Sequence, residues 1–339
     1  MLPTYHDVKH AISPSFDQLE ELRRRLVASR RTLRFILFSI LALNIICYLY
    51  APAFVLPAFA GLIIMIIVYW VRKKKAATQF RAVYKNQIVA PLTQKMVELC
   101  RLPNHHEQYS YVCEYHPTGR VGDDLIHRSH LFPYKISSIQ GEDLFIGKLG
   151  LTNFQFSELK IFQEQDGTDD GMTQELIMFQ GVLFVADFHK DFEGLTVLTG
   201  NMSSTNSRVG KFMTQLSKKL LERRIDAATQ TIKLENEAFN KAFQVRVSHE
   251  GETRYILSSS MMERLLEFKN SGKGRYAPIN ISSVDSCMFV SIWNHKDQFE
   301  GNINQEINNE AVEKLYQELC FYFGLIEDFD LNSRTWSKA

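Results

Sequence analysis

The sequence predicts an α+β protein, in which a two-helix transmembrane hairpin precedes a cytoplasmic domain of antiparallel strands with packed helices. Two observations predict this class. The stretch Phe35–Val71 contains no charged side chain, which is typical of membrane-spanning segments. Beyond about residue 103, apolar residues alternate with polar ones in several short runs, and stretches with apolar residues every three or four positions follow them. These two periods indicate strands and amphipathic helices, respectively.

The apolar stretch is too long for one span. As a single helix it would measure about 55 Å at about 1.5 Å per residue, nearly twice a bilayer core of about 30 Å. Ala51-Pro52 lies at its middle, and proline disfavours helix at the preceding residue, so the stretch divides into two spans. A secretory signal fits less well because the leading segment is long and a second apolar run follows. Two buried soluble helices fit less well because core helices usually keep a polar face.

Basic residues flank both ends of the hairpin, while its connection is uncharged. The positive-inside rule therefore predicts a multi-pass membrane protein with both termini in the cytoplasm. These side chains would also meet anionic lipid headgroups. The residues expected at the membrane surface are Arg23, Arg24, Arg30, Arg31, Arg34, Arg72, Lys73, Lys74 and Lys75.

The chain divides into five expected parts. They are an N-terminal cytoplasmic amphipathic helix (1–34), the hairpin (35–71), a basic juxtamembrane helix (72–102), a β-rich part (103–200) and an α+β part (201–339). The first helix is expected to be capped at Ser13-Pro14-Ser15, and Pro91 is expected to kink the juxtamembrane helix or to start a second one.

Local patterns predict the elements of the folded domain. We expect strands at 143–147, 152–162, 175–188, 195–198, 243–247, 254–257, 279–282 and 287–293, and helices at 211–243, 259–269 and 310–325. A turn is expected at Glu250-Gly251-Glu252.

Composition excludes some classes of function. The net charge is +1 over 339 residues, so no nucleic-acid partner is expected. The five cysteines are scattered and odd in number, which is typical of a reducing compartment and implies no disulfide framework.

Several separated motifs resemble the DUF3137 family of uncharacterised bacterial membrane proteins. They include GEDLFIGKLG at Gly141–Gly150, FQFSELK at Phe154–Lys160, FQGVLFVADFHKDFEG at Phe179–Gly194, RYILSSSMMERLLEF at Arg254–Phe268 and IEDFDLNSRTW at Ile326–Trp336. The resemblance covers about residues 15–336 and implies a membrane-anchored cytoplasmic domain, at the bacterial inner membrane, with no assigned reaction or cofactor. The residues that we assign to these family motifs are Gly141, Glu142, Asp143, Ser157, Glu158, Phe184, Asp187 and Phe188. His189 stands where the family usually has asparagine, which argues against its being a required ligand.

Few residues have the spacing of a reactive site. Cys113-x-x-His116 with His127-x-x-His130 has a spacing that a tetrahedral zinc could use, although histidines in such a loop-rich segment are commonly solvent-exposed. Period two would place Val185, Asp187 and His189 on one face of a strand, but no nucleophile accompanies them. Glu142, Asp143 and Glu158 are read as structural turn and strand residues. No catalytic residue, metal or other cofactor is therefore predicted.

The sequence favours an interaction or scaffold module anchored in the membrane, with lipid and other membrane proteins, or a second copy of the chain, as partners. Leu19, Leu22 and Leu26 form an apolar stripe that would suit a partner helix, and Arg334 and Trp336 lie in a tail that would dock on its own domain or on a partner. Two alternatives stay open. One is a membrane-tethered zinc enzyme or metal sensor, and the other is a module that responds to anionic lipid.

Overall fold

The computed structural model describes residues 2–50, 55–101, 109–165, 174–187, 193–200, 229–270, 279–294, 297–329 and 331. The chain forms two compact units. The helical unit contains Thr4–Lys95 and Gln298–Gln317, and the sheet unit contains Met1–Pro3, Met96–Asp297 and Glu318–Ala339. The chain therefore passes between the units after residues 95, 297 and 317, as well as near its start.

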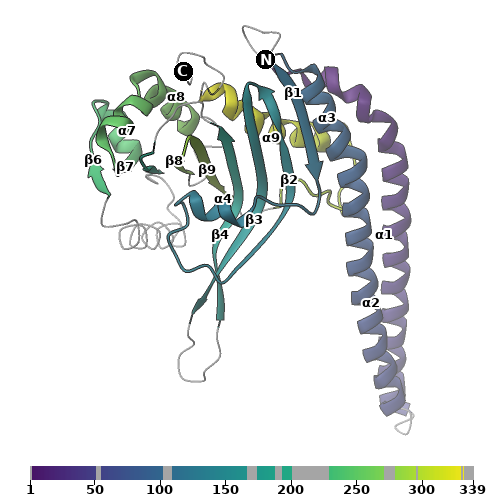
Figure 1. The fold of residues 1–339 in the computed structure, drawn as a ribbon. Helices are drawn as coiled ribbons and strands as arrows, with labels where there is room; N and C mark the ends of the chain where they lie inside the picture. Colours follow the sequence, from purple (N-terminus) through teal and green to yellow (C-terminus); the bar gives the residue numbers. More distant parts are fainter. Residues whose placement is uncertain are drawn as a thin grey trace. The chain divides into compact units, whose positions relative to one another are not determined.

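Two long helices, α1 (Tyr5–Tyr50) and α2 (Val55–Tyr84), lie side by side and antiparallel in the helical unit (Figure 1). The expected division of the apolar stretch is thus confirmed. A π-helical turn, η2 (Lys85–Val89), and helix α3 (Ala90–Leu99) follow. Pro91 stands in the first turn of α3, directly after η2, where its missing N–H cannot donate to the preceding helical turn.

Helix α1 starts earlier than expected. Thr4 donates from its backbone N–H to Asp7 Oδ2 at 2.8 Å, which fixes the first turn eight residues before Ser13. The expected cap at Ser13-Pro14-Ser15 is wrong, because Pro14 lies inside α1. The Ser13 hydroxyl donates to the Lys9 carbonyl at 2.8 Å, as serine often does within helices.

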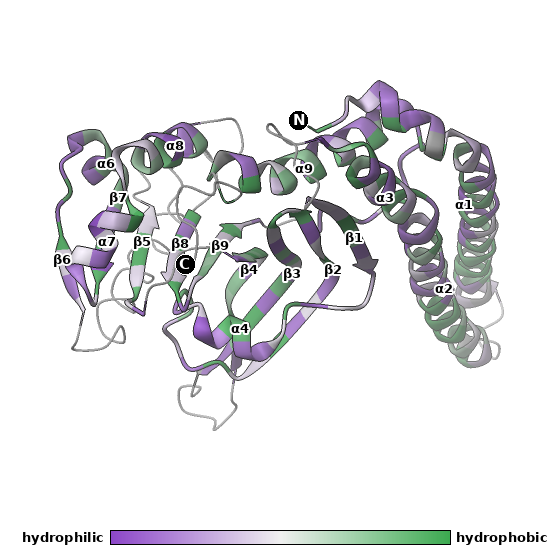
Figure 2. Cartoon of the chain, turned by 45° about the horizontal axis from the view of Figure 1, so that its top comes forward, coloured by the Kyte–Doolittle hydropathy of each residue, from purple (hydrophilic) through white to green (hydrophobic). Residues whose placement is uncertain are grey.

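The adjoining ends of α1 and α2 carry an apolar belt. By length and composition both helices are able to cross a membrane, and hydrophobic colouring dominates these ends in Figure 2. Large apolar side chains are exposed throughout the belt: Phe35, Ile36, Phe38, Leu41, Leu43, Ile45, Ile46, Tyr48, Leu49 and Tyr50 from α1, and Leu56, Phe59, Ile63, Ile64, Ile66, Ile67, Trp70 and Val71 from α2. Asn44 Nδ2 donates to the Ala58 carbonyl of α2 at 3.1 Å and thus links the two helices within the belt.

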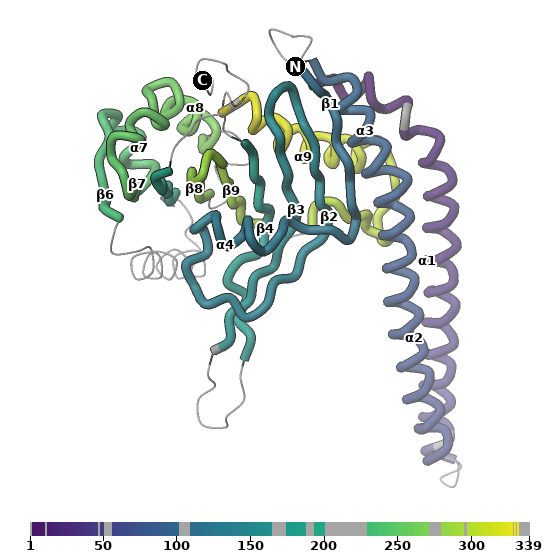
Figure 3. Tube along the Cα trace, viewed as in Figure 1, coloured from purple at the N-terminus to yellow at the C-terminus, as the bar shows by residue number. Residues whose placement is uncertain are grey.

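The sheet unit contains one antiparallel sheet of nine described strands, in the order β1-β2-β3-β4-β9-β8-β5-β7-β6. Strands from both expected halves of the domain pair in it, since β4 pairs with β9. Figure 3 follows β2, β3 and β4 as long neighbouring segments. The strands are β1 (Ser110–His116), β2 (Ser138–Gly150), β3 (Thr152–Gln165), β4 (Gln174–Asp187), β5 (Thr196–Gly200), β6 (Gln230–Ile232), β7 (Phe243–Val247), β8 (Ile279–Val284) and β9 (Cys287–Trp293).

Each face of the sheet has its own core. On one face Phe156 stacks on Phe145, with ring centroids 4.5 Å apart, and on Tyr322 of helix α9 (Asn309–Asp328) at 5.0 Å. On the other face helix α4 (Asp123–Arg128) inserts Ile126 into an apolar cluster that includes Phe289. Burying these aromatic side chains stabilises the unit by about 2 kcal/mol each.

The region around residue 254 differs from the sequence prediction. The expected turn at 250–252 and strand at 254–257 are wrong, because helix α7 (Glu250–Ile256) occupies these residues. Acidic side chains in its first turn favour the helix N-terminus, and Arg254 pairs with Glu250 one turn away at 2.7 Å. Helix α8 (Ser259–Asn270) follows as expected.

The prediction of one long helix at 211–243 is wrong for the residues of this range that the structure describes. Residues 201–228 lie outside the described residues, but β6 and the short helix α6 (Glu237–Ala242) stand in the remainder. Asn236 starts a new helix, because its side chain accepts a hydrogen bond from the Phe239 N–H at 3.0 Å. The apolar positions therefore belong to two elements.

Candidate functional site

An open groove of about 610 Å³ lies on one face of the sheet, lined by β1 to β4, β9 and α4. The strand register explains its lining. Glu114, Ile146, Gln155 and Val185 are directly opposite one another across four strands, and directly opposed residues share a face. The groove therefore combines aliphatic side chains with polar ones.

Charges of both signs lie along the groove. Arg128 and Lys148 contribute positive charge, and Glu114 and Asp187 contribute negative charge. Arg128 Nη2 lies 3.9 Å from Cys287 Sγ. The expectation that Val185 and Asp187 share a face agrees with their joint lining of the groove, while His189 and Phe188 lie outside the described residues. A mixed, open surface of this kind suits a polypeptide partner better than a single charged metabolite.

Three carboxylates gather at a bulge between β2 and β3. Oxygen atoms of Glu142, Asp143 and Glu158 lie within 4.8 Å of one another. Asp143 is fully buried and has a φ of 59°, where the register of β2 shifts. The Tyr115 hydroxyl donates a hydrogen bond to Asp143 Oδ1. Burial raises the pKa of Tyr115, and the Asp143 charge raises it further.

This acidic group could hold a hard divalent cation, because Mg²⁺ and Ca²⁺ prefer oxygen ligands. Sequence reasoning treated the three residues separately. The missed signal is the register, since Glu142 lies directly opposite Glu158 and opposed like charges destabilise a sheet. Such a local conflict is typical of functional positions.

The structure does not bring the four residues of the zinc alternative together. Cys113 and His116 are three positions apart in β1 and so point to opposite faces. Burial raises the pKa of the Cys113 thiol to about 12, whereas zinc binds the thiolate. His127 and His130 are exposed at the end of α4. Among the described residues, the potential metal-binding group is the acidic one above.

In the helical unit, residues 298–308 form a strap that binds α1 and α2. Glu300 lies 2.8 Å from Arg81 and 3.9 Å from Lys85. Arg23 donates to the Ile303 carbonyl at 3.4 Å, and Glu20 accepts the Ile307 N–H at 3.2 Å. Phe299 of the strap is fully buried. These contacts join segments more than 200 residues apart in the sequence.

The strap changes the roles expected for two groups of residues. Arg23 and Arg24 both pair with Glu20, at 2.6 and 3.0 Å. Glu20 therefore offsets part of the positive charge of these two arginines within the helical unit. Leu19 is fully buried in the helical unit, and Leu22 and Leu26 are half-buried, so the leucine stripe packs largely within the chain.

The remaining basic residues form a collar beside the apolar belt, on both helices. We call Arg30, Arg31, Arg34, Arg72, Lys73, Lys74 and Lys75 the collar. Arg30 Nη2 donates to the Lys73 carbonyl at 3.0 Å, which places the two halves of the collar at the same level. Arg334 and Trp336 lie outside the described residues.

A family model matches most of the second half of the chain. A model described as "Protein of unknown function (DUF3137)" matches residues 177–331. The chain carries a DUF3137 region. The family resemblance is thus confirmed within these residues, and the motifs at 141–160 lie before the matched span. No curated protein matches the sequence. The crystal structure of the mycobacterial trehalose monomycolate transport factor A, TtfA, aligns with 62% of this chain and 88% of that one, at 9% identity and a TM-score of 0.28.

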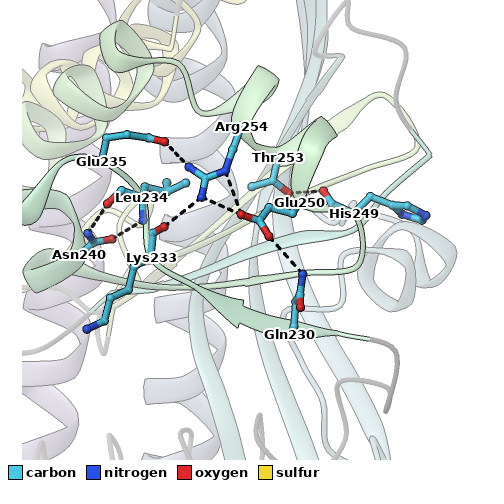
Figure 4. Close-up of polar contacts among 9 residues, drawn as sticks. All are labelled: Gln230, Lys233, Leu234, Glu235, Asn240, His249, Glu250, Thr253 and Arg254. Atoms are coloured by element: carbon cyan, nitrogen blue, oxygen red, sulfur yellow. Dashed lines mark hydrogen bonds and ion pairs between the residues drawn. The ribbon is translucent and has the colours of Figure 1, made fainter.

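The DUF3137 region contains an exposed polar network around Arg254 (Figure 4). Arg254 contacts Glu235, the Glu250 carboxylate at 2.7 Å and the Lys233 carbonyl at 3.4 Å. The Asn240 side chain bonds both backbone groups of Leu234, at 3.0 and 2.7 Å. The network therefore fastens the segment after β6 to α7. Because its contacts join these two segments, we read the network as a structural feature of this region, although exposed ion pairs contribute little to stability.

Other family-motif residues are structural as well. Phe184 of β4 is fully buried within the DUF3137 region. Ser157, which lies before that region, accepts the Val121 N–H at 3.0 Å and so anchors the segment before α4. A Cβ at Gly141 would lie 2.7 Å from the Glu158 carbonyl oxygen, so glycine permits the close approach of β2 and β3.

Proposed function

We propose that this chain is an integral protein of the bacterial inner membrane, in which α1 and α2 form a two-helix anchor and the sheet unit is a cytoplasmic interaction or scaffold module. The observation that carries the proposal is the apolar belt. Its side chains are exposed on both helices and no charge interrupts it between Phe35 and Val71. Exposing so large an apolar surface to water is unfavourable, whereas lipid would cover it.

The charge distribution supports the orientation. The collar adjoins the belt on both helices, while the connecting residues 51–54 are uncharged. Cytoplasmic segments next to membrane spans are enriched in Lys and Arg. Both termini, and hence the sheet unit, would therefore lie on the cytoplasmic side.

The groove supports an interaction role for the sheet unit, with a second membrane protein as the proposed partner. It is open, it combines aliphatic and oppositely charged side chains, and exposed Val112 and Ile146 lie in it. Exposed aliphatic residues surrounded by polar ones are typical of protein-binding surfaces.

Anchoring and orientation are tested by alkaline extraction and by labelling with a membrane-impermeant maleimide. The full-length chain should stay in the membrane pellet after a carbonate wash. In a variant without native cysteines, Ala53→Cys should react in intact spheroplasts, and Glu21→Cys should react only after lysis. Release by carbonate, or labelling of Glu21→Cys in intact spheroplasts, contradicts the proposal.

The interaction role is tested with a photoreactive amino acid at Val112. A membrane-protein partner should crosslink there in cells, with the same amino acid at exposed Glu263 of α8 as the control position. Ile146→Glu should reduce the yield at Val112. Equal yields at both positions, or an unchanged yield with Ile146→Glu, would remove the groove as the interaction surface.

A further inference from the structure

Arg30 is a buried cation without an anion among the described residues. Only 9% of its surface is exposed, and its Nε atom has no hydrogen-bond partner. Its guanidinium has one hydrogen bond, from Nη2 to the neutral Lys73 carbonyl. Burial lowers the pKa of Arg30, Tyr69 partly opposes this shift, and the Arg34 charge adds to it. Burying an uncompensated charge is costly, so this site is suited to binding an anion.

The charges around Arg30 also favour the binding of an anion at this site. The other collar residues are exposed and add six positive charges. No Asp or Glu occurs in the sequence between Glu21 and Glu98. The strap brings Glu300 to α2, but that carboxylate contacts Arg81 and Lys85. Arg31, Arg34 and Arg72 form no ion pair in the part of the chain that the structure describes.

The position of the collar indicates the source of the anion. Arg34 directly precedes the apolar belt and Arg72 directly follows it. Trp70 is an exposed aromatic residue at the end of the belt, and Lys73 Nζ lies 4.8 Å from the centre of its ring. Tryptophan next to basic residues is typical of the level of lipid headgroups. An anion at this level is a phosphate that belongs to a lipid.

We propose that Arg30 and the collar form a binding site for the phosphate of an anionic phospholipid headgroup. The inference rests on the proposed membrane anchor and adds a specific ligand class to it. Arg30 supplies the buried guanidinium, whose planar donors match phosphate. Arg34 and Arg72 supply exposed charge around it. The headgroup would thus hold α1 and α2 together at the membrane surface.

The test uses the full-length chain, purified in neutral detergent and examined by native mass spectrometry with phosphatidylglycerol or phosphatidylcholine. Wild type should retain phosphatidylglycerol in preference to phosphatidylcholine. Arg30→Gln should bind phosphatidylglycerol about tenfold more weakly, the loss expected for one charge-assisted hydrogen bond. Arg25→Gln is the matched control, because exposed Arg25 pairs with Glu21 outside the collar.

Two further variants keep the test valid if Arg30→Gln does not fold. Arg30→Lys keeps the charge and should retain part of the preference. The double variant Arg34→Gln/Arg72→Gln removes only exposed charges and should weaken phosphatidylglycerol binding. Equal retention of both lipids by wild type, or unchanged phosphatidylglycerol affinity in Arg30→Gln, overturns the proposal.

A third arm separates lipid from free anion. Phosphatidylglycerol should raise the unfolding temperature of the detergent-solubilised chain, whereas inorganic phosphate at the same concentration should not. Equal stabilisation by inorganic phosphate overturns the lipid assignment. If the chain stays in carbonate-washed membranes but shows no preference for phosphatidylglycerol, the lipid-binding inference is contradicted and the proposed anchor is not. Release by carbonate contradicts the proposed anchor.

Discussion

Glu300 of the strap and Arg81 of α2 form an ion pair at 2.8 Å, although 219 residues separate them in the sequence. The Glu300 side chain is only 8% exposed, and Lys85, itself buried, lies 3.9 Å away. One carboxylate therefore contacts two cations of the helical unit. This arrangement makes Glu300 the most informative residue of the strap for mutagenesis.

Replacing Glu300 with glutamine should destabilise the helical unit by roughly 3 kcal/mol, because losing one member of a buried pair leaves the other charge uncompensated. The measurement is thermal unfolding of the full-length chain in detergent. Glu310→Gln is the control, since Glu310 is exposed at the start of α9. Equal unfolding temperatures for the two variants would show that the strap does not depend on the ion pair.

Gly301 should not tolerate a larger residue. A Cβ there would lie 2.6 Å from the Tyr84 ring and 3.1 Å from Phe80. Gly301→Ala should therefore cost about 2 kcal/mol through overpacking. Gly251→Ala provides the opposite case, because a Cβ at Gly251 meets nothing within 4 Å and alanine is favoured over glycine in a helix by about 0.5–1 kcal/mol. The two substitutions should shift the unfolding temperature in opposite directions.

Glu20 should contribute to the acid sensitivity of the strap. Hydrogen bonding from Arg23, and more weakly from the Ile307 N–H, lowers the pKa of Glu20 from 4.5 to about 2. Its stabilising contribution is present above pH 4.5 and is lost as pH falls towards 2, since the unfolded state then binds the extra proton. Unfolding temperatures measured across this range should fall more steeply for wild type than for Glu20→Gln. Parallel profiles would contradict the assignment.

Tyr115 should contribute to alkaline sensitivity. Burial and the adjacent Asp143 raise its pKa above the ordinary value of 10.0. The folded state therefore keeps the phenolic proton that the unfolded state loses, and this contribution to stability decreases as pH rises above 10. Tyr115→Phe should be less stable than wild type at pH 8, because it leaves Asp143 without this donor. The difference should narrow above pH 10, and a constant difference would argue against the hydroxyl contact.

The sequence predicted the elements whose signals are local. The hairpin followed from an uninterrupted apolar stretch divided at Pro52, and most strands followed from period-two alternation. Pro91 marked the start of α3. These features depend on neighbouring residues only, and they could be recognised without knowing which distant segments pair.

Features that depend on long-range pairing were missed. Glu142 and Glu158 form an acidic group only because the β2–β3 register opposes them. The zinc alternative relied on linear spacing, but Cys113 and His116 project from opposite faces of β1. The strap could not be predicted from the sequence, because residues 298–308 carry no pattern that identifies α1 and α2 as their partners. At 250–257 we predicted a turn from the acidic residues around Gly251, although the same charges also favour the start of a helix.

The strap also has a consequence for the order of events during synthesis. Residues 298–317 belong to the same unit as Thr4–Lys95, yet about 200 residues separate them. At about 5–20 residues per second, α1 and α2 leave the ribosome roughly 10–40 s before the strap. During this interval the surfaces around Phe80 and Tyr84 lack Gly301 and its neighbours. With the proposed membrane anchor, insertion of α1 and α2 would precede completion of the unit, and a translational pause before residue 298 would prolong the exposure of those surfaces to chaperones.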